Sequence, residues 1–470
     1  MAIAVETERP PSAWQTIREA IRGSEQDFTE GSISRAIFLL ATPMVLEMLM
    51  ESLFAIVNVF WVTRLGSDAV ATVGFTESMM TLVFAVAIGL SMSTTAMVAR
   101  RIGEKDPEGA ATAGVQAIVL ASIVAVLMGV PGYLFASKLL ELMGGSPELV
   151  ATGHRYTAIM LGSNIFVMLL FLNNAIFRGA GDASIAMRVL WAGNLINMIL
   201  DPLLIFGLGP FPELGITGAA VATVIGRGSG VAYQIWILMR GNSRVVIRPS
   251  NFRIVPPVIL SLIRVSITGV LQFAIAHTSW ILLVRIISTF GSVAVAGYTI
   301  GIRIFIFVIL PSWGLSGAAA TMVGQNLGAG KPERAVRAVY LTSIYNMVVL
   351  GVVAAVLIGM PEVIVRLFSS NAGEIGYAVD CLRIIGYGNL VYAVGMVLVQ
   401  AFNGAGDTVT PTWINLIGFW FCEIPLAWFL AFPAGMGVRG VFTSIPIAEA
   451  LITIMGLTLF LKGSWKQRKI

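Results

Sequence analysis

Cysteine and histidine are nearly absent from this sequence. Its 470 residues include two cysteines, Cys381 and Cys422, and two histidines. The cysteines are far apart in the chain and lie in or beside apolar runs, so the sequence predicts neither a disulfide framework nor a thiolate metal site. So few ligands of these types also argue against a metal centre, and we expect no cofactor.

Charged residues are scarce as well. They make up 12% of the chain against 57% hydrophobic residues, and the mean hydropathy is +0.87. A water-soluble domain could not bury so much apolar surface, so we predict an all-α integral membrane protein. The formal net charge is +5, but the basic residues stand between apolar runs rather than along one face. No nucleic-acid partner is therefore expected.

Catalytic and nucleotide-binding motifs are missing too. The sequence contains no His-Glu-x-x-His and no Gly-x-Ser-x-Gly, which argues against an intramembrane enzyme. The stretch from Gly328 to Lys331 lacks the spacing of a P-loop and its Ser or Thr, so ATP binding is not predicted. An ion channel is disfavoured because no ring of repeated filter residues is present.

Apolar runs near twenty residues long predict twelve transmembrane helices. Basic residues gather in alternate loops, for example Arg100, Arg101 and Lys105 after the second span and Lys462 after the last. By the positive-inside rule, both termini of this multi-pass protein of the plasma (inner) membrane are expected to be cytoplasmic. We place the spans at about 33–62, 69–99, 108–135, 148–177, 184–208, 215–239, 255–289, 292–326, 333–359, 374–402, 409–431 and 438–462.

An internal repeat divides the chain into two copies of one design. Gly66-Ser67 returns 225 residues later as Gly291-Ser292, and Gly179-Ala180-Gly181-Asp182 returns as Gly404-Ala405-Gly406-Asp407. Six spans per copy is an even number, so the copies should be related by a pseudo-two-fold axis along the membrane normal. The sequence predicts two six-helix bundles with a cavity between them. Their residues are 33–240 and 255–462, with a cytoplasmic linker at 241–254 and cytoplasmic tails at 1–32 and 463–470.

Further short sequences become informative through their order and spacing. They are Trp61-Val62-(x2)-Leu65-Gly66, Arg178-Gly179-Ala180-Gly181-Asp182, Asn197-(x3)-Asp201-Pro202 and Val323-Gly324-Gln325-Asn326-Leu327-Gly328-Ala329-Gly330. With them, residues 30 to 460 resemble the multidrug and toxic compound extrusion (MATE) family. The resemblance implies a secondary antiporter that exports small organic, often cationic or amphipathic drugs or toxins by alternating access in exchange for H⁺ or Na⁺. We expect it to act as a monomer among membrane lipids.

The resemblance also implies an ion site inside the first bundle. In the family, the positions of Asn58, Asn197 and Asp201 line this site, and Thr223 is a candidate for a further oxygen ligand. A carboxyl group at membrane depth can load and release a proton, whereas a set of oxygen ligands would equally suit Na⁺. Asp201 either couples transport to an ion or has a structural role at the Pro202 bend.

One position departs from the family pattern. Asn58 stands three residues before Trp61, where the family commonly carries Asp. An amide cannot take up and release a proton near neutral pH. Glu51 lies on the same helical face about 10 Å deeper, so we hypothesise that Glu51 and Asp201 share the titrating role. Glu77, at a depth similar to that of Asn58, is a third candidate acid.

The remaining polar residues of the spans allow more than one interpretation. Glu47 is expected to face the cytoplasm and Arg227 to be a buried charge partner. His277 is either a proton carrier or a hydrogen-bonded interior residue, and Arg303 and Glu423 either neutralise each other or face the cavity. For the substrate cavity we predict Met48, Met79, Gln272, His277, Arg303, Tyr387, Tyr392 and Glu423.

A flippase for lipid-linked precursors is the strongest rival. It would share twelve or more spans and a central cavity, but its cavity should be rich in Arg and Lys to hold a pyrophosphate. In the first half of this chain, acids outnumber bases inside the spans. This charge balance favours the antiporter.

Overall fold

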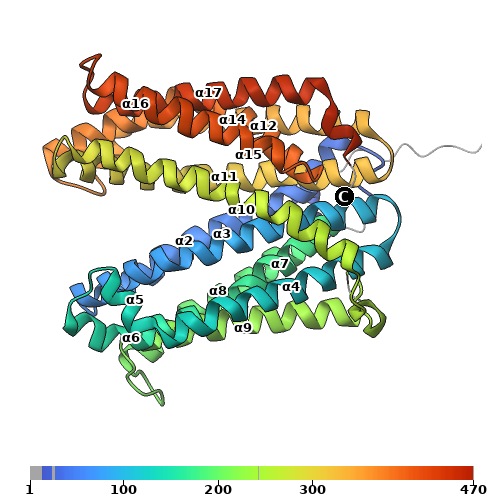
Figure 1. The fold of residues 1–470 in the computed structure, drawn as a ribbon, viewed down its shortest axis with the longest axis horizontal. Coiled ribbons are helices and arrows are strands. Elements are labelled where there is room, and N and C mark those ends of the chain that lie inside the picture. Colours follow the sequence, from blue (N-terminus) through green and yellow to red (C-terminus); the bar gives the residue numbers. More distant parts are fainter. Residues whose placement is uncertain (1–12, 24–26, 242, 469–470) are drawn as a thin grey trace, which may run out of the picture.

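The computed structural model describes residues 13–23, 27–241 and 243–468, and these residues form helices joined by loops, without a strand (Figure 1). The first bundle is built from α2 to α9 and the second from α10 to α17. The first half contains α1 (Ala13–Arg22), α2 (Ile33–Thr63), α3 (Ser67–Gly103), α4 (Pro107–Leu134), α5 (Ala136–Leu142), α6 (Pro147–Gly162), α7 (Asn164–Ala180), α8 (Ala183–Phe206) and α9 (Ile216–Arg240).

The second half has the same order of long helices. It contains η1 (Pro249–Phe252), α10 (Pro256–Ser288), α11 (Ser292–Gly328), α12 (Pro332–Gly359), α13 (Pro361–Val365), α14 (Ala372–Gly404), α15 (Val409–Asn415), the π-helix η2 (Leu416–Glu423), α16 (Ile424–Ala431), α17 (Val438–Lys462) and η3 (Ser464–Gln467).

The twelve predicted transmembrane helices are confirmed. Eleven segments of the described chain are long and apolar enough to cross a membrane. The twelfth is α9, whose 25 residues match the needed length but include Arg227 and four glycines, which lower its hydropathy.

Two spans are not continuous α-helices, and two others are each followed by a short helix. The fourth is broken at Ser163, between α6 and α7, whereas the third and the ninth are followed by α5 and α13. The eleventh contains the π-helical segment η2 just before Pro425. A proline removes one backbone donor, and a π-helical turn is a common way to absorb the resulting irregularity.

The two bundles pack through equivalent pairs of helices. Helix α2 lies along α11, and its counterpart α10 lies along α3, the counterpart of α11. The closest approaches repeat in the same way. A Cβ added at Gly103 would lie 2.0 Å from the carbonyl oxygen of Gln325, and one added at Gly328 would lie 2.1 Å from that of Arg100. These two contacts are related by the 225-residue repeat, which supports the pseudo-two-fold arrangement.

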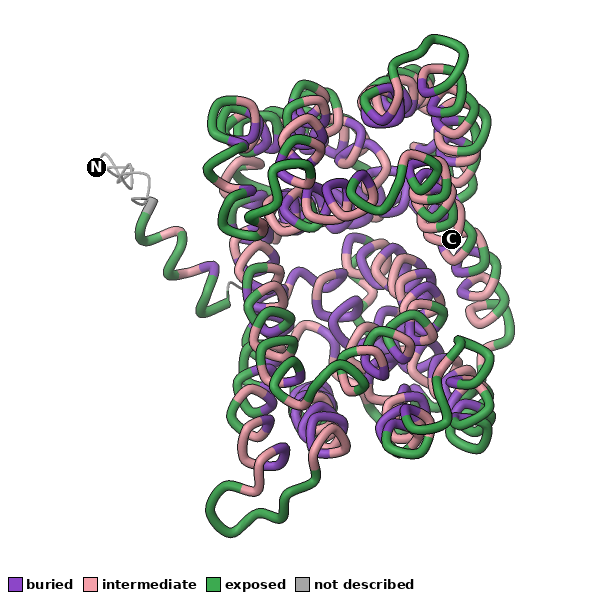
Figure 2. The backbone as a smooth tube through the Cα atoms, turned by 90° about the vertical axis from the view of Figure 1, so that its left-hand side faces the viewer, coloured by how far each residue is buried: buried purple, intermediate pink, exposed green. Residues whose placement is uncertain are grey.

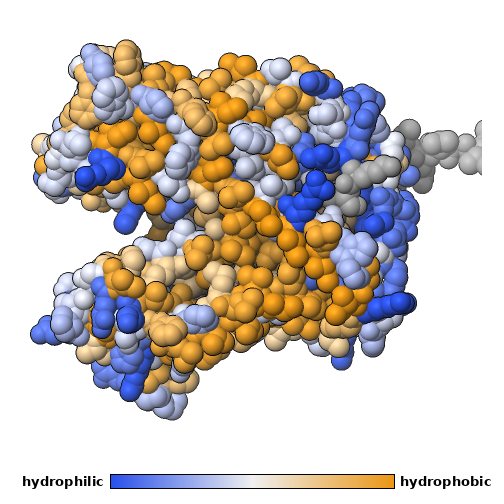
Figure 3. All heavy atoms as spheres, in the orientation of Figure 1, coloured by the Kyte–Doolittle hydropathy of each residue, from blue (hydrophilic) through white to orange (hydrophobic). Residues whose placement is uncertain are grey.

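A cleft separates the bundles at one end of the molecule. Figure 3 shows a deep notch between them at the end opposite the C-terminus of α17, whereas hydrophilic residues cover the end where α17 terminates. The glycine contacts of α3 and α11 belong to the closed end, because both helices finish there (Figure 1). The structure is therefore open on one side and sealed on the other.

Residues 27–31, here called the N-terminal strap, connect the bundles across the closed end. Asp27 pairs with Lys105 of the first bundle. Burial raises the pKa of Asp27, but hydrogen bonds from Lys105 and Thr29 outweigh it and lower the pKa to about 2. From the second bundle, Arg334 donates to the carbonyl oxygens of residues 28, 30 and 31 at 3.3, 2.6 and 2.9 Å.

The predicted linker and C-terminal tail are held by equivalent aspartates. Asp182 accepts hydrogen bonds from the Ser243 hydroxyl and the Arg244 backbone N–H at 2.9 and 3.0 Å. Its counterpart Asp407 forms an ion pair with Arg468 at 3.3 Å. The two Gly-x-Gly-Asp turns thus fasten the segment that follows the sixth helix of their own bundle.

Candidate functional site

The predicted first-bundle site assembles around a buried carboxyl group. Asp201 of α8 has no exposed surface, and the Asn58 amide of α2 lies 3.5 Å from its Oδ2. Asn197, one turn earlier on α8, and Thr223 of α9 are hydrogen-bonded to each other at 3.0 Å. The four predicted oxygen-bearing side chains therefore meet between α2, α8 and α9. Among the described residues, no ion pair includes Asp201.

The Asn197 amide links Asp201 to Thr223. The orientation that satisfies both ends of the amide has its Nδ2 donating to both carboxylate oxygens of Asp201 at 3.0 and 3.1 Å. Its oxygen then accepts from the hydroxyl and the backbone N–H of Thr223 at 3.0 and 3.2 Å. The buried carboxyl group of Asp201 is therefore surrounded by neutral polar groups.

Glu51 occupies a neighbouring but separate position. Its carboxylate accepts from the Asn194 amide of α8 at 3.1 Å. The pairs Glu51 with Asn194 and Asn58 with Asp201 have the same sequence separation of 143 residues, so α2 and α8 run side by side in register. Sequence reasoning missed Asn194, although it lies on the same face of α8 as Asn197, three residues away.

Glu77 does not join either pair. Its side chain is exposed on α3, and the charge that acts on it most strongly is that of Arg303 on α11 of the other bundle. Arg303 is exposed as well. An acid of the first bundle and a base of the second are therefore both exposed on helices that begin at the open end of the molecule (Figure 1).

Glu47 does not face the cytoplasm as predicted. It is 1% exposed and pairs with Arg178 of α7 at 2.5 Å. The same carboxylate oxygen accepts from Asn174 at 3.2 Å, and Gln234 of α9 donates to Asn174 at 2.6 Å. Burial is tolerated because these partners compensate the charge. This network ties α2, α7 and α9 together.

The residues predicted to line the substrate cavity lie in two environments. Glu423 is 4% exposed and accepts from Ser279 at 2.7 Å, and no ion pair joins it to Arg303 among the described residues. Gln272 is buried and accepts from Asn403 at 3.3 Å. The others are partly or fully exposed: Met48, Met79, His277, Tyr387 and Tyr392.

Aromatic contacts surround two of these residues. His277 stacks on Phe273 and meets the edge of Trp280. Tyr392 packs against Phe305 and lines a small cavity of about 60 Å³ together with Asn389 and others. His277 thus lies in aromatic surroundings rather than in a polar network.

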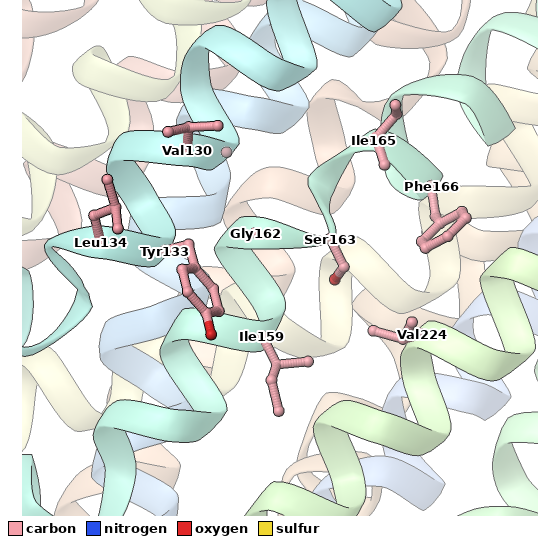
Figure 4. A pocket seen from close by; sticks show the side chains of 10 residues that line it. Val130, Tyr133, Leu134, Ile159, Gly162, Ser163, Ile165, Phe166 and Val224 are labelled. Atoms are coloured by element: carbon pink, nitrogen blue, oxygen red, sulfur yellow. The ribbon is translucent and has the colours of Figure 1, made fainter.

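A larger groove lies outside the predicted cavity. It encloses about 500 Å³ among α4, α6, α7 and α9 and is lined by apolar side chains, with Tyr133 and Ser163 as its polar members (Figure 4). None of the predicted ion or substrate residues contributes to it. The groove is therefore separate from the cleft between the bundles.

A metal centre of the His/Cys/Asp/Glu type is not formed by the described residues, which contain no group of three such side chains close enough to hold an ion. At Asp201, the oxygen atoms available to a sodium ion are those of its carboxylate and of the neighbouring amides and hydroxyl. The same few groups would serve a proton or a sodium ion.

Comparison with known families decides the identity of this helical arrangement. A sequence profile described as MatE matches residues 43–203 and 270–429, once in each bundle. The chain belongs to the MatE family. This finding confirms the resemblance that the short sequence motifs indicated, and the double match reflects the internal repeat.

Several MatE relatives are similar over nearly their whole length. A probable multidrug resistance protein NorM of Thermotoga maritima is 25% identical over 445 residues, with 93% of this chain and 94% of the relative covered. An FAD transporter of Shewanella oneidensis is 24% identical over 440 residues, covering 90% and 93%. These relatives of the chain are named as a probable multidrug resistance protein and as a transporter.

Solved structures agree with the fold. A transporter of the MOP superfamily from Pyrococcus furiosus, described as having a binding pocket of reverse polarity, has a TM-score of 0.87 and 25% identity, with 94% of this chain and 98% of that chain covered. A MATE-family transporter in an outward-facing conformation also has a TM-score of 0.87, at 24% identity, with coverage of 94% and 98%. At 24% identity, the second structure shows that the fold is shared and no more.

Proposed function

We propose that this MatE transporter is a proton-coupled antiporter that exports cationic or amphipathic organic compounds by alternating access. The moving bodies are the bundles at residues 33–240 and 255–462, joined by the linker at 241–254, and the protein acts as a monomer. With both termini in the cytoplasm, the open cleft of Figure 3 faces away from the cytoplasm. In that state protons and released substrate exchange with the outer solution.

One observation carries the choice of the proton. Asp201 is fully buried, no ion pair includes it among the described residues, and its neighbours are the neutral amide and hydroxyl groups of Asn58, Asn197 and Thr223. A buried charge inside a membrane protein costs about 2.5–3.5 kcal/mol even on lenient scales, and a proton on Asp201 removes that charge. Uptake and release of a proton at Asp201 would therefore switch the site between a neutral and a charged state.

The cleft chemistry supports the proposed substrate class. Glu77 lies exposed on the first bundle and offers a carboxylate to a cationic group. Arg303 on the second bundle would repel a simple cation but attract an acidic substituent. One relative is named an FAD transporter, and FAD is a large aromatic anion. We therefore propose amphipathic substrates with a cationic group near Glu77.

The test uses purified protein in proteoliposomes with a fluorescent organic cation. An imposed pH gradient should drive export by the parent protein, and an imposed sodium gradient should not. Asp201→Asn should still bind the cation but lose the gradient-driven movement, because the shape of the side chain survives and its titratable group does not. Asp380→Asn is the matched control, since Asp380 forms a surface ion pair with the exposed Arg439.

Sodium-driven export, or normal pH-driven export by Asp201→Asn, would refute the proposal. The first result would assign the oxygen ligands to Na⁺, and the second would remove Asp201 from the mechanism.

A further inference from the structure

The N-terminal helix α1 has an apolar face that stays exposed among the described residues. Trp14 is 74% exposed, and Ile17 and Ile21 are each 37% exposed. Their spacing of three and four residues places them on one side of the helix. Arg18 and Arg22 follow along one border of this face.

The opposite side of α1 is attached to the first bundle. Ala20 is 2% exposed within a cluster that includes Ile37 of α2. Glu19 forms an ion pair with Arg35, in the first turn of α2, at 2.7 Å. Gly23, just after α1, lies next to Ser184 in the first turn of α8. The helix is therefore fixed at the level where α2 and α8 begin.

The direction of α1 differs from that of the spans. Figure 2 looks along the bundles and shows the spans nearly end-on, whereas α1 extends sideways from them. A helix at this level and in this direction runs along the plane in which the membrane surface must lie. The second turn of α2 also carries an exposed apolar side chain, Phe38, which is 48% exposed.

We propose that α1 is an interfacial anchor that inserts Trp14, Ile17 and Ile21 into the boundary between lipid headgroups and acyl chains. Interfacial helices combine an apolar face containing Trp with Lys or Arg on the polar face, as α1 does. Arg18 and Arg22 are placed to contact anionic headgroups, each contributing roughly five-fold to the attraction of such a membrane. The partner is the lipid surface itself, and the inference holds whether or not the transported ion is a proton.

The experiment measures the depth of α1 in the full-length transporter. Single cysteines replace Ile17 or Gln15 in a chain without Cys381 and Cys422, are labelled with a nitroxide, and are reconstituted in vesicles of phosphatidylcholine and phosphatidylglycerol. Collisions with apolar oxygen should exceed those with a water-soluble nickel chelate at position 17. At position 15, on the polar side of the helix, the chelate should dominate.

Two further measurements separate the lipid surface from other occupants. Trp14→Glu should return the label at position 17 to water, and Arg18→Ala should reduce its immersion in anionic vesicles more than in vesicles of phosphatidylcholine alone. Chelate access at position 17 equal to that at position 15 would overturn the proposal. Shielding from both collision partners, with spin–spin broadening, would overturn it in favour of a second copy of the chain.

Discussion

The crossing of α3 and α11 at the closed end gives a sharp mechanical test. A Cβ at Gly103 would lie 2.0 Å from the Gln325 carbonyl oxygen, whereas ordinary contacts begin near 3.4 Å. The backbone of a helix cannot yield locally, so Gly103→Ala must separate the two helices by about 1.4 Å. Overpacking of this kind costs about 1–3 kcal/mol. Here it would destabilise the conformation that is closed at this end by that amount relative to the conformation that is open there.

This cost becomes a measurable shift between conformations. A change of 1–3 kcal/mol corresponds to roughly 5- to 150-fold in an equilibrium. The readout is a cysteine at Ser266 in a chain without Cys381 and Cys422. The Ser266 hydroxyl lies 2.7 Å from that of Ser93 across the bundle interface and is buried in the sealed state. Its rate of reaction with a maleimide added from the closed side should rise by the same factor.

The matched control lies on the same helix. Gly74 of α3 has open space where its Cβ would be, so Gly74→Ala gains the same helix propensity, up to about 1 kcal/mol, without any clash. It should leave the labelling rate unchanged. An equal labelling rate in Gly103→Ala and the parent, with both proteins folded, would show that the α3–α11 contact is not the seal.

Four further predictions address the coupling site, the strap and the topology, two of them concerning the strap. If Glu51 shares the titrating role, export by Glu51→Gln should lose its dependence on external pH. Asn58→Asp should shift the pH optimum of export without abolishing it. Unchanged coupling in Glu51→Gln would leave Asp201 acting alone. Arg334→Ala removes the hydrogen bonds to the strap and should weaken closure by about 1 kcal/mol, seen as a roughly five-fold faster labelling at Ser266. Because the pKa of Asp27 is about 2, its pair with Lys105 should contribute equally throughout the neutral and mildly acidic range and be lost only as the pH falls toward that value. A cysteine at Lys331 should react with impermeant reagents only from the cytoplasm and one at Ser146 only from outside; labelling of both from one side would refute the orientation.

The positions of the helices could be predicted from the sequence, but the contacts that attach the terminal segments to the bundles could not. Apolar runs and the 225-residue repeat predict the twelve spans and their grouping. This works because a membrane-spanning helix makes its backbone hydrogen bonds within itself and carries mainly apolar side chains. The charged tails carry no such periodicity. Trp465 lies in the predicted C-terminal tail, yet it has no exposed surface and stacks on Phe460. Nothing local in the sequence indicates that docking.

The candidate site shows the same division. Asn58, Asn197, Asp201 and Thr223 come together as the short motifs and helical depth indicate. Asn194 was missed because a single amide in an apolar span gives no sign of its partner. Polar pairs across helices depend on the rotation of each helix, which hydropathy alone does not fix.

The contacts that close and attach the two bundles are repeated in both halves, whereas the candidate ion site is not. Gly103 and Gly328 are equivalent and form equivalent contacts at the seal, and Asp182 and Asp407 fasten equivalent segments. Asp201, however, corresponds to Leu426 in the second repeat. A proton at Asp201 can therefore act directly on one bundle only, through α2 and α8. Because α2 packs on α11 and α3 packs on α10, a movement of α2 in the first bundle is transmitted to the second bundle.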